Sequence, residues 1–105
     1  MAQYLYVLRP VRLAMLTDAA TDDEIRIVGE HFQHLKVQIE QGVAILLGRT
    51  QPDDARTFGI VIFNAEDEAA ATAIMNSDPA VKQGIMTAEL FPYKIALMRE
   101  ANIQP

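Results

Sequence analysis

The sequence predicts an α+β fold in which helices cover an antiparallel sheet, with the order strand, helix, strand, strand, helix, strand. Three observations predict it: a helix start signal before a long amphipathic segment, two short apolar runs joined by a turn-rich segment, and an alanine-rich segment before a last extended run. With 105 residues, 50% hydrophobic and 22% charged, the chain has the length and composition of one globular domain. We expect residues 1–105 to form that single domain.

The first strand is expected over residues 4–9. This segment is rich in aromatic and branched residues, which favour strands, and it is followed by Pro10, which has no amide hydrogen to donate. Residues 11–20 show no clean period. We interpret them as a connection with an extended or turn portion near residues 13–16.

The first helix is expected over residues 22–41. Thr21 and Glu24 have the spacing of a capping box, in which each side chain bonds the other residue's amide. Gly42 stands where a helix commonly ends in a left-handed residue. The apolar residues that recur at spacings of three or four are Ile25, Val28, Phe32, Leu35 and Ile39.

Two short apolar runs, residues 43–47 and 58–63, are expected to be strands. The charged segment between them carries turn residues, which predicts an antiparallel hairpin. The second helix follows, with Asn64 as its expected cap and an acidic first turn at residues 66–68.

Asp78 and Pro79 then predict a short turn or helix that closes at Gly84. The last strand is expected from about residue 85 to residue 98. Pro92 lies inside it, which predicts an edge position or a bulge because proline cannot donate to a neighbouring strand.

This order is that of a ferredoxin-like βαββαβ fold, and its two helices can cover only one face of the sheet. Residues 44–47 and 60–63 are apolar at every position, whereas a strand facing water on one side would alternate. A second copy of the same sheet is the simplest cover for the other face, so we expect a homodimer.

Composition excludes several functions. The net charge of −5, without any basic run, argues against a nucleic-acid partner. The absence of cysteine removes disulfides and thiolate chemistry, and fits a reducing compartment. Residues 1–10 lack the apolar core of a signal peptide, and the apolar runs fall far short of about 18 residues, so we expect a cytoplasmic protein without a membrane partner.

Three stretches together resemble the YCII-related family, whose members are small dimeric α+β barrels built from two ferredoxin-like halves. They are the helix segment His31-Phe32-Gln33-His34-Leu35 running to Gly42, the strand end Leu46-Leu47-Gly48, and Ser77-Asp78-Pro79-Ala80-Val81 before Gly84-Ile85. The resemblance implies a pocket that holds His31 and Asp78 as a catalytic pair. We therefore expect a direct or water-mediated contact between them.

The residues themselves leave two readings of this pair. On a helical wheel His31 falls at the edge of the expected apolar stripe and His34 toward solvent, so His31 is the better acid-base candidate or else a boundary histidine that caps the core. Asp before Pro is also what a helix start favours. The two roles of Asp78 are compatible, since a capping carboxylate is already oriented toward a neighbour.

Arg9 and Arg49 end the first and second strands, where they are candidates for binding an anionic substrate through charge-assisted bonds. Solvated strand ends are the simpler explanation. The sequence has no serine-elbow motif, no phosphate-binding glycine loop and no set of residues with metal-ligand spacing. We expect no bound cofactor or metal.

The leading hypothesis is a homodimeric small-molecule enzyme without a bound cofactor, in which His31 and Asp78 transfer protons on a small anionic or ring-bearing substrate. The reaction would be of lyase, isomerase or hydrolase type. One alternative is a domain of the same fold that binds a metabolite or a protein and catalyses nothing. Another is a cofactor-free oxygenase.

Overall fold

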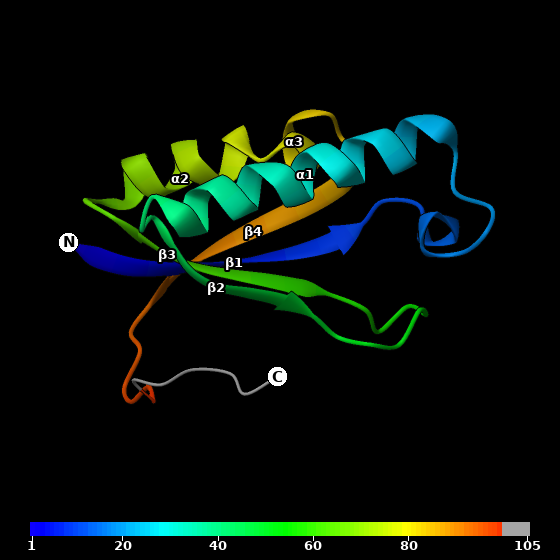
Figure 1. The fold of residues 1–105 in the computed structure, drawn as a ribbon. Helices are drawn as coiled ribbons and strands as arrows, with labels where there is room; N and C mark the ends of the chain where they lie inside the picture. The colour runs from blue at the N-terminus through cyan, green and yellow to red at the C-terminus, as the bar shows by residue number, and fades with distance from the viewer. Residues whose placement is uncertain (100–105) are drawn as a thin grey trace.

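The computed structural model describes residues 1–99, which form a four-stranded antiparallel sheet whose α-helices all lie on one face (Figure 1). Its elements in chain order are β1 (Ala2–Pro10), the 3-10 helix η1 (Leu13–Leu16), α1 (Asp22–Glu40), β2 (Ala44–Arg49), β3 (Gly59–Ala65), α2 (Glu68–Ser77), α3 (Pro79–Lys82) and β4 (Met86–Tyr93). The strand order is β2-β3-β1-β4, with every pair antiparallel. This is the expected ferredoxin-like arrangement.

The first helix begins and ends as its sequence signals predict. The Thr21 side chain accepts from the Glu24 amide, and the Glu24 side chain accepts from the Thr21 amide, so the capping box is complete. After the last turn, Gly42 adopts a φ of 76°, a left-handed conformation that favours glycine. These local signals fix the ends of α1 within one residue of the expected range.

Other boundaries differ from expectation: β1 runs over Ala2–Pro10 rather than residues 4–9, and β2 over Ala44–Arg49 rather than residues 43–47. β3 continues to Ala65, so Asn64 lies in the strand and Asp67 caps α2 instead, its side chain accepting from the Ala70 amide. The last strand ends at Tyr93 rather than at residue 98. Pro92 lies in β4, which is an edge strand as expected.

The expected phase of α1 is wrong. Ile25 is 62% exposed and Phe32 63% exposed, whereas Glu24, Ile27 and Leu35 are buried. Part of the reason is that Phe32 lines a cavity instead of packing against other side chains. The other part is that α3 packs against α1 and covers a second side of the helix. His34, expected toward solvent, is half-buried.

The core lies between the sheet and the helices. Tyr6 and Phe63 are each 1% exposed, and their ring centroids lie 5.5 Å apart in an edge-to-face arrangement. Ala71 of α2 and Ala80 of α3 are fully buried, and their small side chains allow both helices to lie close to the strands. This packed region fills the end of the layer beneath α2.

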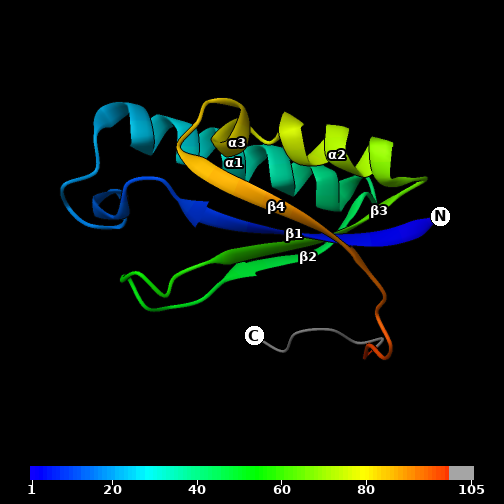
Figure 2. The same cartoon turned by 180° about the vertical axis from the view of Figure 1, so that it is seen from behind.

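The other face of the sheet carries no helix (Figures 1 and 2). Residues 94–99 leave the sheet on that side, and the Ile95 amide donates to the Gln3 side chain. Leu46 and Phe91 lie on this face, 43% and 38% exposed. No helix within residues 1–99 is long and apolar enough to cross a bilayer.

Candidate active site

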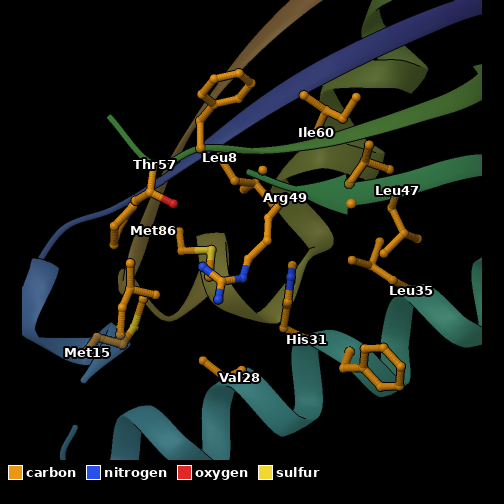
Figure 3. Close-up of a pocket in the computed structure, with 17 residues that line it drawn as sticks. Leu8, Met15, Val28, His31, Leu35, Leu47, Arg49, Thr57, Ile60 and Met86 are labelled. Carbon is orange, nitrogen blue, oxygen red and sulfur yellow. The ribbon is translucent and has the colours of Figure 1, made fainter. Parts of the chain in front are cut away.

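A cavity of about 450 Å³ lies between the sheet and α1 at the end of the layer near η1 (Figure 3). The sheet forms its floor and α1 its roof. Its lining residues are Leu8, Pro10, Met15, Leu16, Val28, His31, Phe32, Leu35, Leu47, Gly48, Arg49, Thr57, Phe58, Gly59, Ile60, Val61 and Met86. Pockets of about 300 to 1,000 Å³ are the size that binds small molecules.

His31 and Asp78 meet at the wall of this cavity, as expected. His31 Nδ1 and Asp78 Oδ1 lie 2.6 Å apart, with the imidazole 15% exposed and the carboxylate completely buried. An ionised carboxylate only accepts, so Nδ1 carries the hydrogen. His31 lines the cavity and Asp78 lies behind it, which leaves the Nε2 edge of the ring for a bound molecule.

Asp78 accepts two further hydrogen bonds. Its Oδ1 accepts from the Ala80 amide at 3.0 Å, which caps α3, and its Oδ2 accepts from the Tyr6 hydroxyl at 2.8 Å. Burial alone would raise the pKa of the Asp78 carboxyl, but the hydrogen bond and attraction of His31, with the bonds from Tyr6 and Ala80, hold that pKa below its ordinary value. Asp78 is therefore a fixed charge that orients the imidazole.

Tyr6 is the site residue that the sequence did not single out. Burial, together with the charge of Asp78 and the hydrogen bond to it, raises the pKa of Tyr6 well above its ordinary value, so the hydroxyl stays a donor. Strand alternation places Tyr6 on the helix-facing side with Tyr4 and Leu8. No sequence signal indicated that its hydroxyl would meet a carboxylate 72 positions away.

The two arginines are not brought together. Arg49 lines the cavity, and in Figure 3 its side chain extends into the same space as His31. Its Nη1 also donates to Asp53 at 3.0 Å, in a pair that is about half exposed on both sides. Arg9 does not line the cavity, because Leu8 takes the helix-facing position and the next side chain points to the other face. There its guanidinium lies 5.5 Å from the centre of the Phe58 ring.

The rest of the lining is apolar apart from Thr57. Among the lining residues, His31, Arg49 and Thr57 carry the polar side chains, and none carries a carboxylate. A fixed cation in an apolar cavity favours an anion with an apolar body. Within residues 1–99, no three His, Cys, Asp or Glu side chains gather closely enough to hold a metal ion.

The connection between β1 and α1 closes one end of the cavity through Met15 and Leu16 of η1. Arg12, just before η1, holds this connection against α1 by donating to both carboxylate oxygens of Glu24, at 3.0 and 2.6 Å, and to the Ala19 carbonyl. The bond from Arg12 and the Thr21 amide lower the pKa of Glu24 to about 2. Glu24 thus serves both the helix cap and the cavity wall.

The model of the YCII-related domain matches residues 8–94. The chain belongs to the YCII-related family. No curated protein matches it in sequence.

Among solved structures, the chain is similar to 5-chloro-2-hydroxyhydroquinone dehydrochlorinase from Burkholderia phenoliruptrix in complex with 2,5-dihydroxybenzoquinone. The TM-score is 0.61 at 18% identity, over 87% of this chain and 93% of that chain. At this identity the likeness extends to the fold. The fold and family expected from the sequence are both confirmed.

Proposed function

We propose that this YCII-related chain is a small-molecule enzyme in which His31 and Asp78 carry out acid-base chemistry on a small ring-bearing anion. The observation that carries the proposal is the 2.6 Å contact between His31 Nδ1 and the buried Asp78 carboxylate at the wall of an apolar cavity. A histidine whose one nitrogen is held by a carboxylate has its other nitrogen oriented for proton transfer.

The roles follow from the contacts. Asp78 fixes the tautomer, so that Nε2 of a neutral His31 accepts a proton from the substrate and the resulting imidazolium can return it. Tyr6 donates to Asp78 and keeps the carboxylate charged and in place. Arg49 binds the negative charge that the substrate carries or develops. The chain's own residues supply every one of these roles.

Of the lyase, isomerase and hydrolase reactions open to such a pair, we favour a lyase. The structurally similar dehydrochlorinase was solved with a dihydroxybenzoquinone, a small planar ring with acidic oxygens. In the lyase step proposed here, a bond to hydrogen on the substrate breaks, and Nε2 of His31 takes the proton. The electron pair of that bond moves into the ring system as a leaving group departs as an anion. Arg49 then stabilises negative charge on the ring oxygens.

The working unit is proposed to be a homodimer that joins the helix-free faces of two sheets. Leu46 and Phe91 are exposed on that face, and strand alternation places Leu5 and Val7 of β1 there as well. A face-to-face dimer should bury about 1,200 to 2,000 Å² in total. Sedimentation at micromolar concentration should give twice the chain mass, and Val7→Glu should give a monomer; a monomeric parent chain would contradict the proposal.

The test of function begins with a thermal-shift screen of small ring anions, because a ligand that binds only the folded state raises the melting temperature. Each ligand found is then assayed for turnover. Replacing His31 with alanine should lower kcat by about 10² to 10⁴-fold, the usual contribution of acid-base catalysis. His34→Ala is the matched control, because His34 lies on the same helix but does not line the cavity.

Equal effects of the two substitutions would remove His31 from the mechanism. If ligands bind but no bound ligand turns over, the chain is a binding domain and the acid-base proposal fails. Loss of binding in His31→Ala without any turnover in the parent chain would support that second reading.

A further inference from the structure

Gly59 is an unusual residue for its place in the sheet. It lies on β3, a central strand, at a position that faces the helices. The other helix-facing positions of this strand carry Val61, Phe63 and Ala65, all buried in the core. Glycine inside a strand weakens it and often marks a point where a ligand approaches the backbone closely.

The backbone gives no reason for glycine here. Among residues 1–99, the glycines with a positive φ are Gly42 and Gly84, so Gly59 has a conformation that other residues adopt. A Cβ built at Gly59 would lie 3.4 Å from the Gly48 carbonyl oxygen and 3.8 Å from the Cβ atoms of Leu8 and Arg49. These are ordinary van der Waals distances, so a methyl group fits the fold.

A side chain at position 59 would occupy part of the cavity. Gly59 pairs with Leu8 on one neighbouring strand and with Arg49 on the other, and all three line the cavity. The floor between Leu8 and Arg49 is therefore bare peptide backbone. A bare strand presents a flat surface, against which a planar ring can make contact over its whole face.

We propose that Gly59 is the specificity-determining residue of this cavity and selects a planar anionic ring. The ring lies face-on against the Gly59 backbone between the side chains of Leu8 and Arg49, with an anionic oxygen toward the Arg49 guanidinium. A saturated, puckered ring with the same charge touches this floor only through its protruding hydrogens and binds more weakly. This inference rests on the proposed function for its site, and it names the substrate class.

The test compares benzoate with cyclohexanecarboxylate, which carry the same carboxylate on a planar and a puckered ring. Calorimetric titration of the parent chain should give tighter binding of benzoate, by about tenfold. Gly59→Ala should weaken benzoate binding by about tenfold or more, the effect of one methyl group in a fitted pocket, and Gly59→Val should abolish it. Both variants should melt no lower than the parent chain without ligand.

The matched control is Gly29→Ala, the same chemical change on α1, where an added Cβ meets nothing within 4 Å. It should leave both affinities unchanged. The proposal is overturned if the parent chain binds neither carboxylate, if it binds both equally well, or if Gly59→Ala binds benzoate as tightly as the parent chain does.

Failure of this inference and failure of the proposed function are distinguishable, because the titrations need no turnover. Preference for benzoate that depends on Gly59, together with a His31→Ala variant that keeps full turnover, would leave the Gly59 role standing and remove the acid-base mechanism. Loss of turnover in His31→Ala, with equal binding of benzoate and cyclohexanecarboxylate, would leave the acid-base mechanism standing and remove the Gly59 role.

Discussion

The two ends of the layer between sheet and helices differ in how they are filled. Beneath α2, Tyr6 and Phe63 are in edge-to-face contact, and the fully buried Ala71 brings the helix close to the strands. Beneath the middle of α1, the sheet carries Gly59 and the ends of the strands, and a cavity of about 450 Å³ remains. One sheet thus carries a close-packed core at one end and a cavity at the other.

Asp78 lies where these two regions meet. Its Oδ2 accepts from Tyr6, a core residue, and its Oδ1 accepts from His31, a cavity residue. The packed end holds the carboxylate rigidly, and the carboxylate orients the imidazole at the open end. A small domain can thus use its packed core to orient a side chain at a cavity, and the residues that fill the core are distinct from those that line the cavity.

The largest expected difference concerns two phenylalanines. Phe63 is 1% exposed in the packed end, and Phe32 is 63% exposed on the cavity wall. Phe63→Ala should lower the free energy of unfolding by about 4 kcal/mol, because it opens a void in a close-packed core. Phe32→Ala should lower it by less than about 0.5 kcal/mol, since an exposed side chain loses little on truncation, while weakening ligand binding. Chemical denaturation measures both.

A loss of stability as large in Phe32→Ala as in Phe63→Ala would show that the cavity wall is part of the folding core. The separation of the two regions would then be wrong.

A smaller effect on stability is expected at Asp78, where the packed end of the layer meets the cavity. Tyr6→Phe keeps the ring and removes the hydroxyl, so one oxygen of the buried Asp78 carboxylate loses its partner. A hydrogen bond to a buried charge contributes about 2 kcal/mol, and the free energy of unfolding at pH 7 should fall by that amount. Turnover should fall through kcat with KM little changed, because Tyr6 does not line the cavity.

The stability lost in Tyr6→Phe should also depend on pH, in a direction set by the pKa of Asp78. The folded-state pKa of Asp78 lies below its ordinary value of 3.8. Its contribution to stability is therefore fully present above about pH 3.8 and is lost as the pH falls through the lower folded value. Tyr6→Phe brings the folded pKa back toward 3.8, so the stability gap to the parent chain should shrink on acidification. Tyr4→Phe is the control, since Asp78 accepts from Tyr6 and not from Tyr4.

The sequence predicted the elements because their signals are local. The Thr21 capping box, the Gly42 helix end and the two apolar runs each act within a few residues, and the structure confirms all of them. The phase of α1 was predicted wrongly because an apolar stripe normally meets packed side chains. Here Val28 and Phe32 line a cavity, and the polar Glu24 is buried by its bonds to Arg12.

The site was predictable only in part. The family resemblance indicated the His31 and Asp78 pair, and the fold brings these two residues, 47 positions apart, into contact. Tyr6 could not be found because its partner lies 72 positions away, and an aromatic residue in a strand is ordinary core composition. Arg9 was a candidate for binding an anionic substrate, but strand alternation beside Leu8 turns it to the other face.

The smallest expected effect concerns the connection that closes the cavity. Arg12→Ala removes the bonds to Glu24 and to the Ala19 carbonyl. The Arg12 side chain is 46% exposed, so solvent screens the ion pair, and the loss of global stability should be smaller than in Tyr6→Phe.

The bond from Arg12 holds the pKa of Glu24 at about 2 against an ordinary value of 4.5. The contribution is therefore fully present above about pH 4.5 and is lost as the pH falls toward 2, and the gap between variant and parent chain should shrink over that range. The local effect should be larger than the global one: hydrogen exchange should speed up at the amides of Met15 in η1 and of Thr17 just after it, and stay unchanged in the packed end. Unchanged exchange in η1 would show that Met15 and Leu16 hold the cavity end closed without Arg12.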